Sequence, residues 1–480
     1  MSFSSQSDTS WETPEEFYQQ RDHRTQLEVA NLHSYVNCPL EIWVAPEEAD
    51  KIEVQQTLLM ASNLTARWNR CLTVITPDAP LAGPLTSMGE STLHSRITRE
   101  LQEADPFGDF HVGVQRRETA MPPLRLFIGT WPDRSRLWPE DYTITASSWV
   151  VLGARGSVGP PAACMDKASA SAAYLAGAIG AADLFKRAVG QPRSRWLSRI
   201  AWCTWSNRLC HNEESLPMTE VVEPELGRLL VAGVGAIGSA ILYILGGTQI
   251  KADIALLDRD TVEASNLNRS PLFTVRDAAN RTSKVAAGKQ WLENHGLTAQ
   301  IFQGEWNEHL SKIQQDSFDV WVSLTNENGV WGQLPYQLPP VVIHGTTTSG
   351  WGLALGRHIP RVEDCTLCRM PRPEAVFRPP CAEGEIVATP ERLPVRASLP
   401  FLSSAAAALV VAELCKMPYL HRMVTPNSVS ADLLYGLQAL ISIQRGPDLK
   451  CPGCRISQSK TWHQYGGRSR YAPLSQNIAG

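Results

Sequence analysis

The sequence LLVAGVGAIGSAILYILGG at residues 229–247 sets the architecture that we expect for this chain. The apolar run at residues 229–232 is typical of a buried β-strand, and a longer apolar segment with helical period follows it. Between the two lie three glycines with the spacing G-x-G-x-x-G, namely Gly233, Gly235 and Gly238. A strand, a tight glycine turn and a helix in this order let backbone N–H groups approach a phosphate closely.

A second strand is expected at residues 253–257, and it ends in Asp258. This acid lies 20 positions after Gly238, where such folds place the carboxylate that binds a ribose hydroxyl. The pattern up to this point indicates a nucleotide, and a dinucleotide-dependent dehydrogenase is its default interpretation.

The residues just beyond Asp258 favour a triphosphate instead. A second acid, Asp260, is followed by Asn266 and Arg269 in the sequence SNLNR, and Lys284 begins another helical segment. Amide and cationic side chains of this kind neutralise the charge of the ATP phosphates and of a pyrophosphate leaving group. A dehydrogenase does not need them next to its ribose-binding acid.

About half of the chain, from near Leu226 to near Arg455, resembles the adenylating core of the ThiF, MoeB and ubiquitin-activating superfamily. The resemblance rests on the glycine turn, the D-x-D pair, the N-L-N-R sequence and the downstream lysine. It implies an α/β Rossmann-like adenylating fold, with a mixed sheet and helices on both faces, that binds ATP and Mg²⁺. It also implies roles for the quoted residues: Asp258 and Asp260 lie at the nucleotide, with Asp258 on the ribose, whereas Asn266, Arg269 and Lys284 contact phosphates and the last two are catalytic.

The overall composition excludes other classes of function. The chain has 48 acidic and 44 basic residues, so its net charge of −4 gives no electrostatic reason to bind nucleic acid or an anionic membrane. Its polar, acidic N-terminus does not resemble a signal peptide, and the Ala-rich runs at residues 168–185 and 403–414 are expected to be buried helices. Eleven cysteines with two C-x-x-C pairs in 480 residues favour a reducing cytoplasm and a metal site over a disulfide framework.

Residues 1–210 also alternate between strands, such as residues 40–44 and 71–75, and helices. The turn after residue 44 reads APEEADK, which has no glycine fingerprint and carries acids that would repel a phosphate. The helix expected at residues 168–189 resembles the one that closes adenylating domains. We therefore predict a degenerate, inactive copy of the same fold, followed by a linker at residues 211–225, with an unrelated α/β domain as the alternative.

Arg21 and Arg24 lie in the N-terminal helical sequence FYQQRDHRTQL. The resemblance implies that an N-terminal arginine can reach an active site across a domain or dimer interface. The other interpretation is that both arginines belong to a solvated helix face.

The strand expected at residues 319–324 ends in Thr325, Asn326 and Glu327. The resemblance implies the sequence T-D-N here, with an aspartate that helps to place Mg²⁺, and Asn326 occupies that position. An amide is a weaker ligand for Mg²⁺ than a carboxylate. Either Glu327 or a shifted register supplies the carboxylate, or the site is attenuated.

Two C-x-x-C pairs, Cys365 with Cys368 and Cys451 with Cys454, are expected to form a structural Zn²⁺ site. Each pair can occupy two corners of a tetrahedron, and four thiolates without a histidine are typical of a closed site. A redox dithiol is the alternative, but neither pair is expected at the head of a helix after a strand.

Cys381 lies in a Pro-, Glu- and Arg-rich loop expected at about residues 370–400. The resemblance implies that this loop crosses over the active site, where a cysteine can attack the adenylate and form a thioester. Arg378 beside it could lower the pKa of the thiol. The alternative is a loop cysteine without a role.

These observations predict an adenylation domain at residues 226–456 and a loosely ordered tail at residues 457–480. The expected function is ATP-dependent adenylation of a ubiquitin-like protein that ends in Gly, followed by thioester formation, in a cytoplasmic enzyme most like those of bacterial antiphage operons. A conjugating enzyme is an expected partner and a homodimer is possible. The alternatives are activation of a sulfur carrier for thiamine or molybdopterin synthesis, and a non-catalytic scaffold that binds a ubiquitin-like protein.

Overall fold

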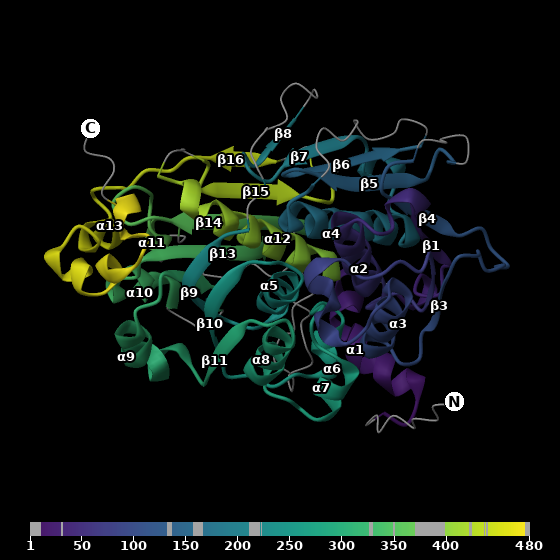
Figure 1. Ribbon diagram of the computed structural model, residues 1–480, viewed down its shortest axis with the longest axis horizontal. Coiled ribbons are helices and arrows are strands. Elements are labelled where there is room, and N and C mark those ends of the chain that lie inside the picture. The colour runs from purple at the N-terminus through teal and green to yellow at the C-terminus, as the bar shows by residue number, and fades with distance from the viewer. Residues whose placement is uncertain are drawn as a thin grey trace.

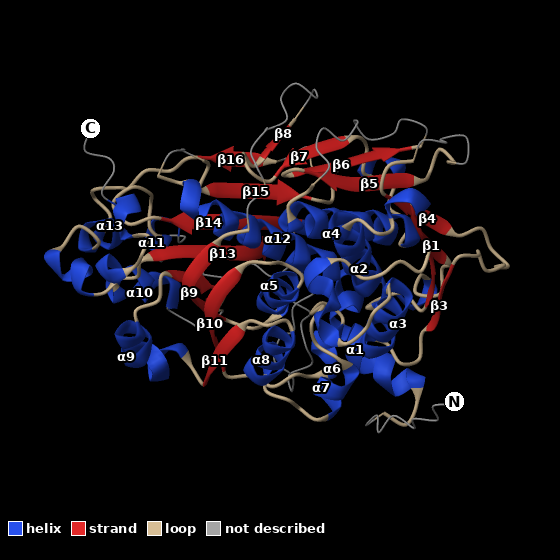
Figure 2. Cartoon of the chain, viewed as in Figure 1, coloured by secondary structure: helices blue, strands red, loops and turns tan. Residues whose placement is uncertain are grey.

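The computed structural model describes residues 11–29, 32–131, 137–156, 167–210, 221, 223–325, 330–348, 351–369, 399–421, 425–435, 437 and 440–475. Within them the chain builds two eight-stranded mixed sheets with helices packed between them (Figure 1). We call residues 11–210 the first half and residues 223–475 the second half. The two sheets lie at opposite ends of the long axis of the molecule, and their antiparallel strands meet along one side (Figure 2).

The sheet of the second half has the order β11-β10-β9-β12-β13-β14-β15-β16. Neighbouring strands are parallel from β11 to β13 and antiparallel from there to β16. Its strands are β9 (Glu225–Ala232), β10 (Lys251–Asp258), β11 (Thr298–Gln303), β12 (Val320–Ser323), β13 (Val341–Thr348), β14 (Gly352–His358), β15 (Ser428–Asp432) and β16 (Ile441–Ile443).

The sheet of the first half repeats this order as β3-β2-β1-β4-β5-β6-β7-β8, with the same switch from parallel to antiparallel pairing after its fifth position. Its strands are β1 (Leu40–Val44), β2 (Cys71–Ile75), β3 (Asp109–Gly113), β4 (Leu124–Ile128), β5 (Tyr142–Ser147), β6 (Val150–Arg155), β7 (Ile200–Cys203) and β8 (Arg208–Leu209). An identical order and direction of eight strands identifies the two halves as copies of one Rossmann-like fold, which confirms the predicted fold class.

An arginine–carboxylate ion pair occurs at corresponding places in both copies and supports this equivalence. Arg155 at the end of β6 pairs with Asp183 of α4 (Ala170–Ala188). Arg357 of β14, the strand that corresponds to β6, pairs with Glu413 of α12 (Pro400–Lys416) at 2.5 Å. Both pairs fasten the closing helix of a half to the same strand of its sheet.

The remaining helices cover the sheets unequally. In the second half α5 (Ala236–Gly246), α8 (Lys284–Asn294) and α12 lie on one face, whereas α9 (Trp306–Asp316) and α10 (Val330–Gln333) cover the other. Accordingly, Leu229 and Val231 of β9 join one apolar cluster, whereas Leu230 and Ala232 join the other. The other α-helices in the described part of the chain are α1 (Pro14–Glu28), α2 (Ile52–Ala66), α3 (Leu93–Ala104), α6 (Ala264–Leu267), α7 (Val275–Ala279), α11 (Thr366–Arg369) and α13 (Pro452–Ile456).

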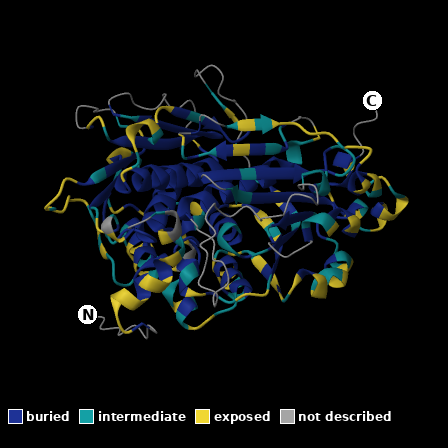
Figure 3. Ribbon diagram, turned by 180° about the vertical axis from the view of Figure 1, so that it is seen from behind, coloured by how far each residue is buried: buried dark blue, intermediate teal, exposed yellow. Residues whose placement is uncertain are grey.

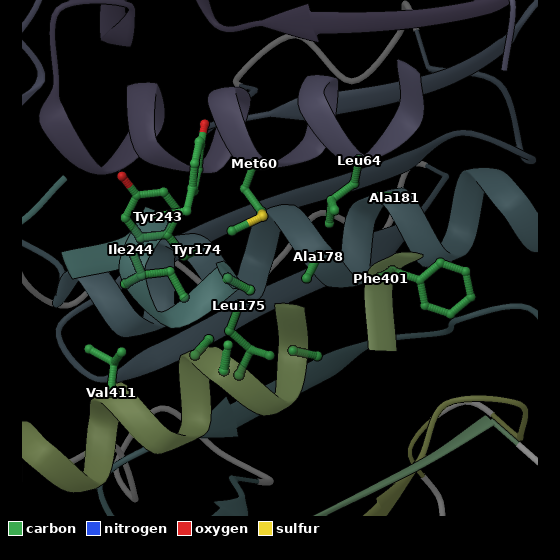
Figure 4. Close-up of a cluster of buried hydrophobic side chains, with 14 of the residues drawn as sticks. Met60, Leu64, Tyr174, Leu175, Ala178, Ala181, Tyr243, Ile244, Phe401 and Val411 are labelled. Atoms are coloured by element: carbon green, nitrogen blue, oxygen red, sulfur yellow. The ribbon is translucent and has the colours of Figure 1, made fainter. Parts of the chain in front are cut away.

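The two halves share one hydrophobic core. Helices α4 and α12 pack against each other between the sheets, and α2 and α5 pack against them. Figure 4 shows Leu64 of α2, Leu175 of α4, Ile244 of α5 and Val411 of α12 within this layer. The buried residues run through the middle of the molecule (Figure 3). Removal of this apolar surface from water is the main force that joins the halves.

Within the described residues one helical stretch, Pro400–Tyr419, is long and apolar enough to cross a membrane, but the apolar window is entirely buried in the core. This agrees with the buried helix that the sequence predicts.

Residues 457–475 differ from the loosely ordered tail that the sequence predicts. They form short 3₁₀ turns, and Trp462 is only 1% exposed because it packs with Leu338 and Ala472. Its indole nitrogen donates to the carbonyl of Pro339 at 2.9 Å. The polar composition of the tail concealed this aromatic anchor.

Candidate functional site

The glycine turn connects β9 to α5 as the sequence predicts. Gly233 has φ +98°, and a Cβ there would lie 2.9 Å from the carbonyl carbon of Leu324. A Cβ on Gly238 would lie 2.1 Å from the carbonyl oxygen of Gly233. Gly235, the N-cap of α5, has nothing within 4 Å of its Cβ position. Two of the glycines therefore permit close packing of the backbone, and Gly235 leaves open space above the turn.

Asp258 ends β10 beside this turn. One of its carboxylate oxygens accepts a hydrogen bond from the backbone N–H of Val234 at 2.7 Å, and the other accepts from that of Asp260 at 2.9 Å. These bonds hold the carboxylate at the turn. Each oxygen keeps capacity for another donor such as a hydroxyl.

Lys284 begins α8 and reaches back to the same edge of the sheet. Its ammonium group lies 2.8 Å from a carboxylate oxygen of Asp260, and its backbone N–H donates to the Asp260 carbonyl at 3.0 Å. The side chain of Lys284 is 9% exposed and that of Asp260 is 54% exposed. The contact places a largely buried cation beside a carboxylate that faces solvent.

Asn266 and Arg269 lie in and just after α6. The side-chain oxygen of Asn266 accepts from the backbone N–H of Glu263 at 3.0 Å, which forms half of a capping box. The Arg269 guanidinium donates to the carbonyl of Ser265 at 2.5 Å and to the side-chain oxygen of Asn268 at 2.9 Å. Both predicted residues are buried, and their side chains are held by neighbours within the same short helix and turn.

The end of β12 lies next to the glycine turn. Within the described part of the chain, the buried hydroxyls of Ser323 and Thr325 have no hydrogen-bond partner. Both hydroxyls are therefore available to a polar ligand at this edge of the sheet. Ser323 was not a predicted site residue, although a polar residue at the tip of an apolar strand was a usable signal. Asn326 and Glu327 lie outside the described residues.

The N-terminal arginines lie in α1, which packs against α6. Arg21 is 0% exposed and pairs with Asp22 and Asp105, each at 2.6 Å, inside the first half. The solvated-face interpretation is therefore wrong for Arg21. Its charge is neutralised by Asp22, the next residue, and by Asp105, which is distant in sequence, and helical periodicity reveals neither pairing. Arg24 is partly exposed on the same helix.

The turn of the first half that corresponds to the glycine turn is occupied by an acid. After β1, residues Pro46–Glu48 form a 3₁₀ turn, and a carboxylate oxygen of Glu48 accepts from the backbone N–H of Thr130 at 2.5 Å. The same oxygen lies 2.5 Å from the Cβ position of Gly129, the residue that follows β4. A negative charge in this place opposes the binding of a phosphate.

The four predicted metal ligands converge. The Sγ atoms of Cys365 and Cys368 are 3.8 Å apart, those of Cys365 and Cys451 3.7 Å, and those of Cys368 and Cys454 3.4 Å. All four lie within 4.8 Å of one another. A tetrahedron with Zn–S bonds of about 2.3 Å has edges of about 3.8 Å, so the four thiols fit Zn²⁺.

The local structure of the two pairs differs from the expectation. Cys365 directly precedes α11, and Cys451 is the N-cap of α13, so each pair does lie at the head of a short helix. The convergence of all four thiols, rather than the local position of either pair, is what favours a metal over redox chemistry. Cys381, Arg378 and residues 370–398 of the predicted crossover loop lie outside the described residues.

The second half of the chain matches a known family. Residues 225–434 match the model of the ThiF family. Solved structures of Escherichia coli MccB resemble this chain, and each match covers 47% of this chain. The structure with AMPCPP and MccA has 17% identity, is covered over 66% of its own chain and has a TM-score of 0.37. For the structure with ATP the identity is 17%, the coverage of that chain 65% and the TM-score 0.37, and for MccB alone they are 19%, 64% and 0.38.

In each of these matches the aligned region spans less than two thirds of MccB. The comparison with curated proteins found no match. Residues 225–434 of this chain are a ThiF-family domain.

Proposed function

We propose that the second half binds MgATP and adenylates the C-terminal carboxylate of a protein or peptide. The observation that carries this proposal is the glycine turn of a ThiF-family domain with Asp258 bonded to the turn and Lys284 held beside Asp260. Asp258 ends a parallel strand, and ligands of open α/β folds bind at this carboxyl edge of the sheet. Asn266 and Arg269, which follow this strand in the chain, would supply further amide and cationic groups.

In the proposed reaction a carboxylate oxygen of the substrate attacks the α-phosphorus of ATP. The bond to the bridging oxygen breaks, and the products are an acyl adenylate and pyrophosphate. Asp258 would hold the ribose, the N–H groups near Gly235 would approach the phosphates, and Arg269 and Lys284 would neutralise the charge that develops on the leaving group. Mg²⁺ would add to this neutralisation, with Asn326 as the predicted ligand residue.

The specific substrate that we propose is a ubiquitin-like protein that ends in Gly. The thiolate of Cys381 would then attack the acyl carbon of the adenylate, which forms a thioester and releases AMP. A conjugating enzyme would next receive the acyl group, in the cytoplasm, as in antiphage conjugation systems. The acid that closes the equivalent turn of the first half supports an inactive role for residues 1–210. Because α4 and α12 already pair the two halves within one chain, a homodimer would have to use another surface.

The first test of this proposal is nucleotide binding followed by substrate-dependent exchange. Isothermal titration with MgATP is expected to show binding to the full chain that Arg269→Ala reduces at least tenfold. ATP–pyrophosphate exchange is then measured with each small protein that is encoded beside the gene and ends in glycine, and with a version that lacks this glycine. Absence of MgATP binding to the wild type would overturn the enzyme function, and binding of such a protein without exchange would favour the scaffold.

The second step has a separate test. A thioester adduct that reducing thiols cleave is expected in the wild type and is expected to be absent in Cys381→Ala. Exchange without any adduct would favour the sulfur-carrier type of activation, which needs adenylation only. An adduct that persists in Cys381→Ala would show that another cysteine is the nucleophile.

A further inference from the structure

Arg67 extends from the first half of the chain into the second. It caps the C-terminus of α2 and is 2% exposed. Its guanidinium donates to the backbone carbonyls of Leu267 at 2.7 Å, Pro271 at 2.8 Å and Phe273 at 3.2 Å. It also donates to the side-chain oxygen of Asn63, one turn earlier on α2, at 2.7 Å. One buried cation of the first half therefore spans the two ends of a segment, residues 267–273, that contains Arg269.

A second side chain of α2 supports this contact between the two halves. Asn63, which orients Arg67, also donates to the Pro271 carbonyl at 3.1 Å, so two side chains of α2 serve the same acceptor. Burial lowers the pKa of Arg67 to about 9, so the guanidinium remains charged at neutral pH. Charged donors make stronger hydrogen bonds than neutral ones, and the planar guanidinium offers several at fixed angles.

A second, separate contact from the first half leads directly to the side chain of Arg269. Asn268 is 0% exposed and donates from its side chain to the hydroxyl of Thr25 on α1 at 2.8 Å. The side-chain oxygen of Asn268 accepts from the Arg269 guanidinium at 2.9 Å. Thr25 thus fixes the amide that orients Arg269.

We propose that Arg67 and Thr25 are positioning residues through which the first half holds the 267–273 segment and aims Arg269 at the nucleotide. The proposal rests on the proposed function of the second half. It assigns the first half an active part in the chemistry, although its own phosphate turn is closed. Preorganised charges stabilise a transition state better than charges that must first be brought into place, so the holding contacts favour catalysis without touching substrate.

The test compares Arg67→Lys, Arg67→Met and Thr25→Val with matched controls in the intact chain. The control for Arg67 is Arg187→Lys, because Arg187 of α4 is also buried and donates to backbone carbonyls, those of Arg125 and Glu140, within the first half. The control for Thr25 is Thr65→Val. The hydroxyl of Thr65 donates to the carbonyl of Ala61 within α2 at 2.7 Å. Three quantities are measured: the melting temperature, hydrogen exchange of the amides in residues 267–273 without nucleotide, and the Kd of a non-hydrolysable ATP analogue with Mg²⁺.

We expect the Arg67 variants to exchange the 267–273 amides roughly tenfold faster and to bind the analogue roughly tenfold more weakly, because buried carbonyls lose their charged donor. Thr25→Val is also expected to weaken binding of the analogue, with a smaller increase in the hydrogen exchange of the 267–273 amides. Both controls are expected to leave exchange and Kd unchanged, even where they lower the melting temperature. Arg67→Lys is expected to retain more affinity than Arg67→Met.

The proposal is overturned if Arg67→Lys and Arg187→Lys lower the melting temperature equally and Arg67→Lys alters neither the exchange of residues 267–273 nor the Kd of the analogue. Arg67 would then have a structural role only. If Arg67→Met does not fold, Arg67→Lys and Thr25→Val decide the outcome. If the wild type does not bind the analogue, the proposed function fails with it, whereas faster exchange in the Arg67 variants alone still supports the holding of the segment.

Discussion

Gly235 and Gly238 lie three residues apart, yet a side chain would meet different surroundings at each. A methyl group on Gly238 would collide with the Gly233 carbonyl oxygen at 2.1 Å, and backbone cannot move aside as a flexible side chain can. Gly238→Ala is therefore expected to lower the free energy of unfolding by about 2 kcal/mol or more. Chemical denaturation of the purified variant measures this loss.

Gly235→Ala is the matched variant, since nothing lies within 4 Å of the added methyl. Its unfolding free energy is expected to stay close to that of the wild type, whereas binding of MgATP weakens because the methyl enters the space that the phosphates would occupy. Wild-type affinity in Gly235→Ala would show that phosphates do not approach this side of the turn.

Lys284 offers a second residue-scale prediction. Its side chain is 9% exposed and its ammonium group pairs with Asp260, so its charge is held in place before any ligand binds. Lys284→Met is expected to raise the Kd for MgATP at least tenfold, which corresponds to about 1.4 kcal/mol. Titration calorimetry provides the measurement.

Lys289→Met on the same helix is the control for this prediction, because Lys289 pairs with Glu293 at 3.6 Å and its side chain is 39% exposed. Equal effects of the two substitutions would indicate a general loss of positive charge rather than a contact with phosphate.

At the scale of elements, the four thiols connect α11 to α13, two short helices 86 residues apart in sequence. Each helix is too short to be stable alone, so a metal bound between them would stabilise both. We expect Zn²⁺ in the purified protein by elemental analysis, and we expect Cys454→Ser to lose it and to lower the melting temperature by about 5 °C or more.

Cys415→Ala is the control for the cysteine cluster, since Cys415 is a buried thiol of α12 away from the other four. Zinc content equal to that of the wild type in Cys454→Ser would contradict a four-thiolate site.

At the scale of the whole molecule, Lys186 joins the two halves. It lies at the end of α4, is 0% exposed, and donates to the carbonyl of Arg195 at 2.9 Å and to those of Leu433 and Leu434 in the second half. Burial lowers the pKa of Lys186 from 10.5 to about 8, against the opposing effect of Asp183 and Asp432. The interface therefore contains a group that titrates differently in the folded and unfolded chain.

Between pH 8 and 10.5 the unfolded chain binds more protons at Lys186 than the folded chain, so this group makes stability rise with pH. Relative to Lys186→Met, the unfolding free energy of the wild type is expected to increase by up to about 3 kcal/mol between pH 8 and pH 10.5. Urea denaturation at pH 7.5 and pH 10 measures it, with the exposed Lys251→Met as control. A difference that does not change with pH would contradict the shifted pKa.

Local pattern was sufficient for much of the fold and of the candidate site. The strands Leu40–Val44 and Cys71–Ile75 have the predicted bounds, and the glycine turn, Asp258 and the two C-x-x-C pairs lie where spacing placed them. These features depend on residues within one strand, turn or helix, where periodicity and glycine geometry act over a few positions. Whether Asp258, Arg269 and Lys284 bind nucleotide stays a prediction.

Contacts between distant segments could not be obtained in this way. The burial of Arg21 depends on its ion pair with Asp105, and the ordered structure of the tail depends on the packing of Trp462. The position of the 267–273 segment depends on hydrogen bonds from Arg67 in the other half. In each case a side chain finds its partner far along the chain, and hydrophobic periodicity contains no information about which partner that is. Composition and spacing thus predicted two α/β halves and a glycine turn suited to a phosphate. The order of the strands established that the halves are copies, and the packing of α4 against α12 established that they share one core, because this contact joins residues of both halves.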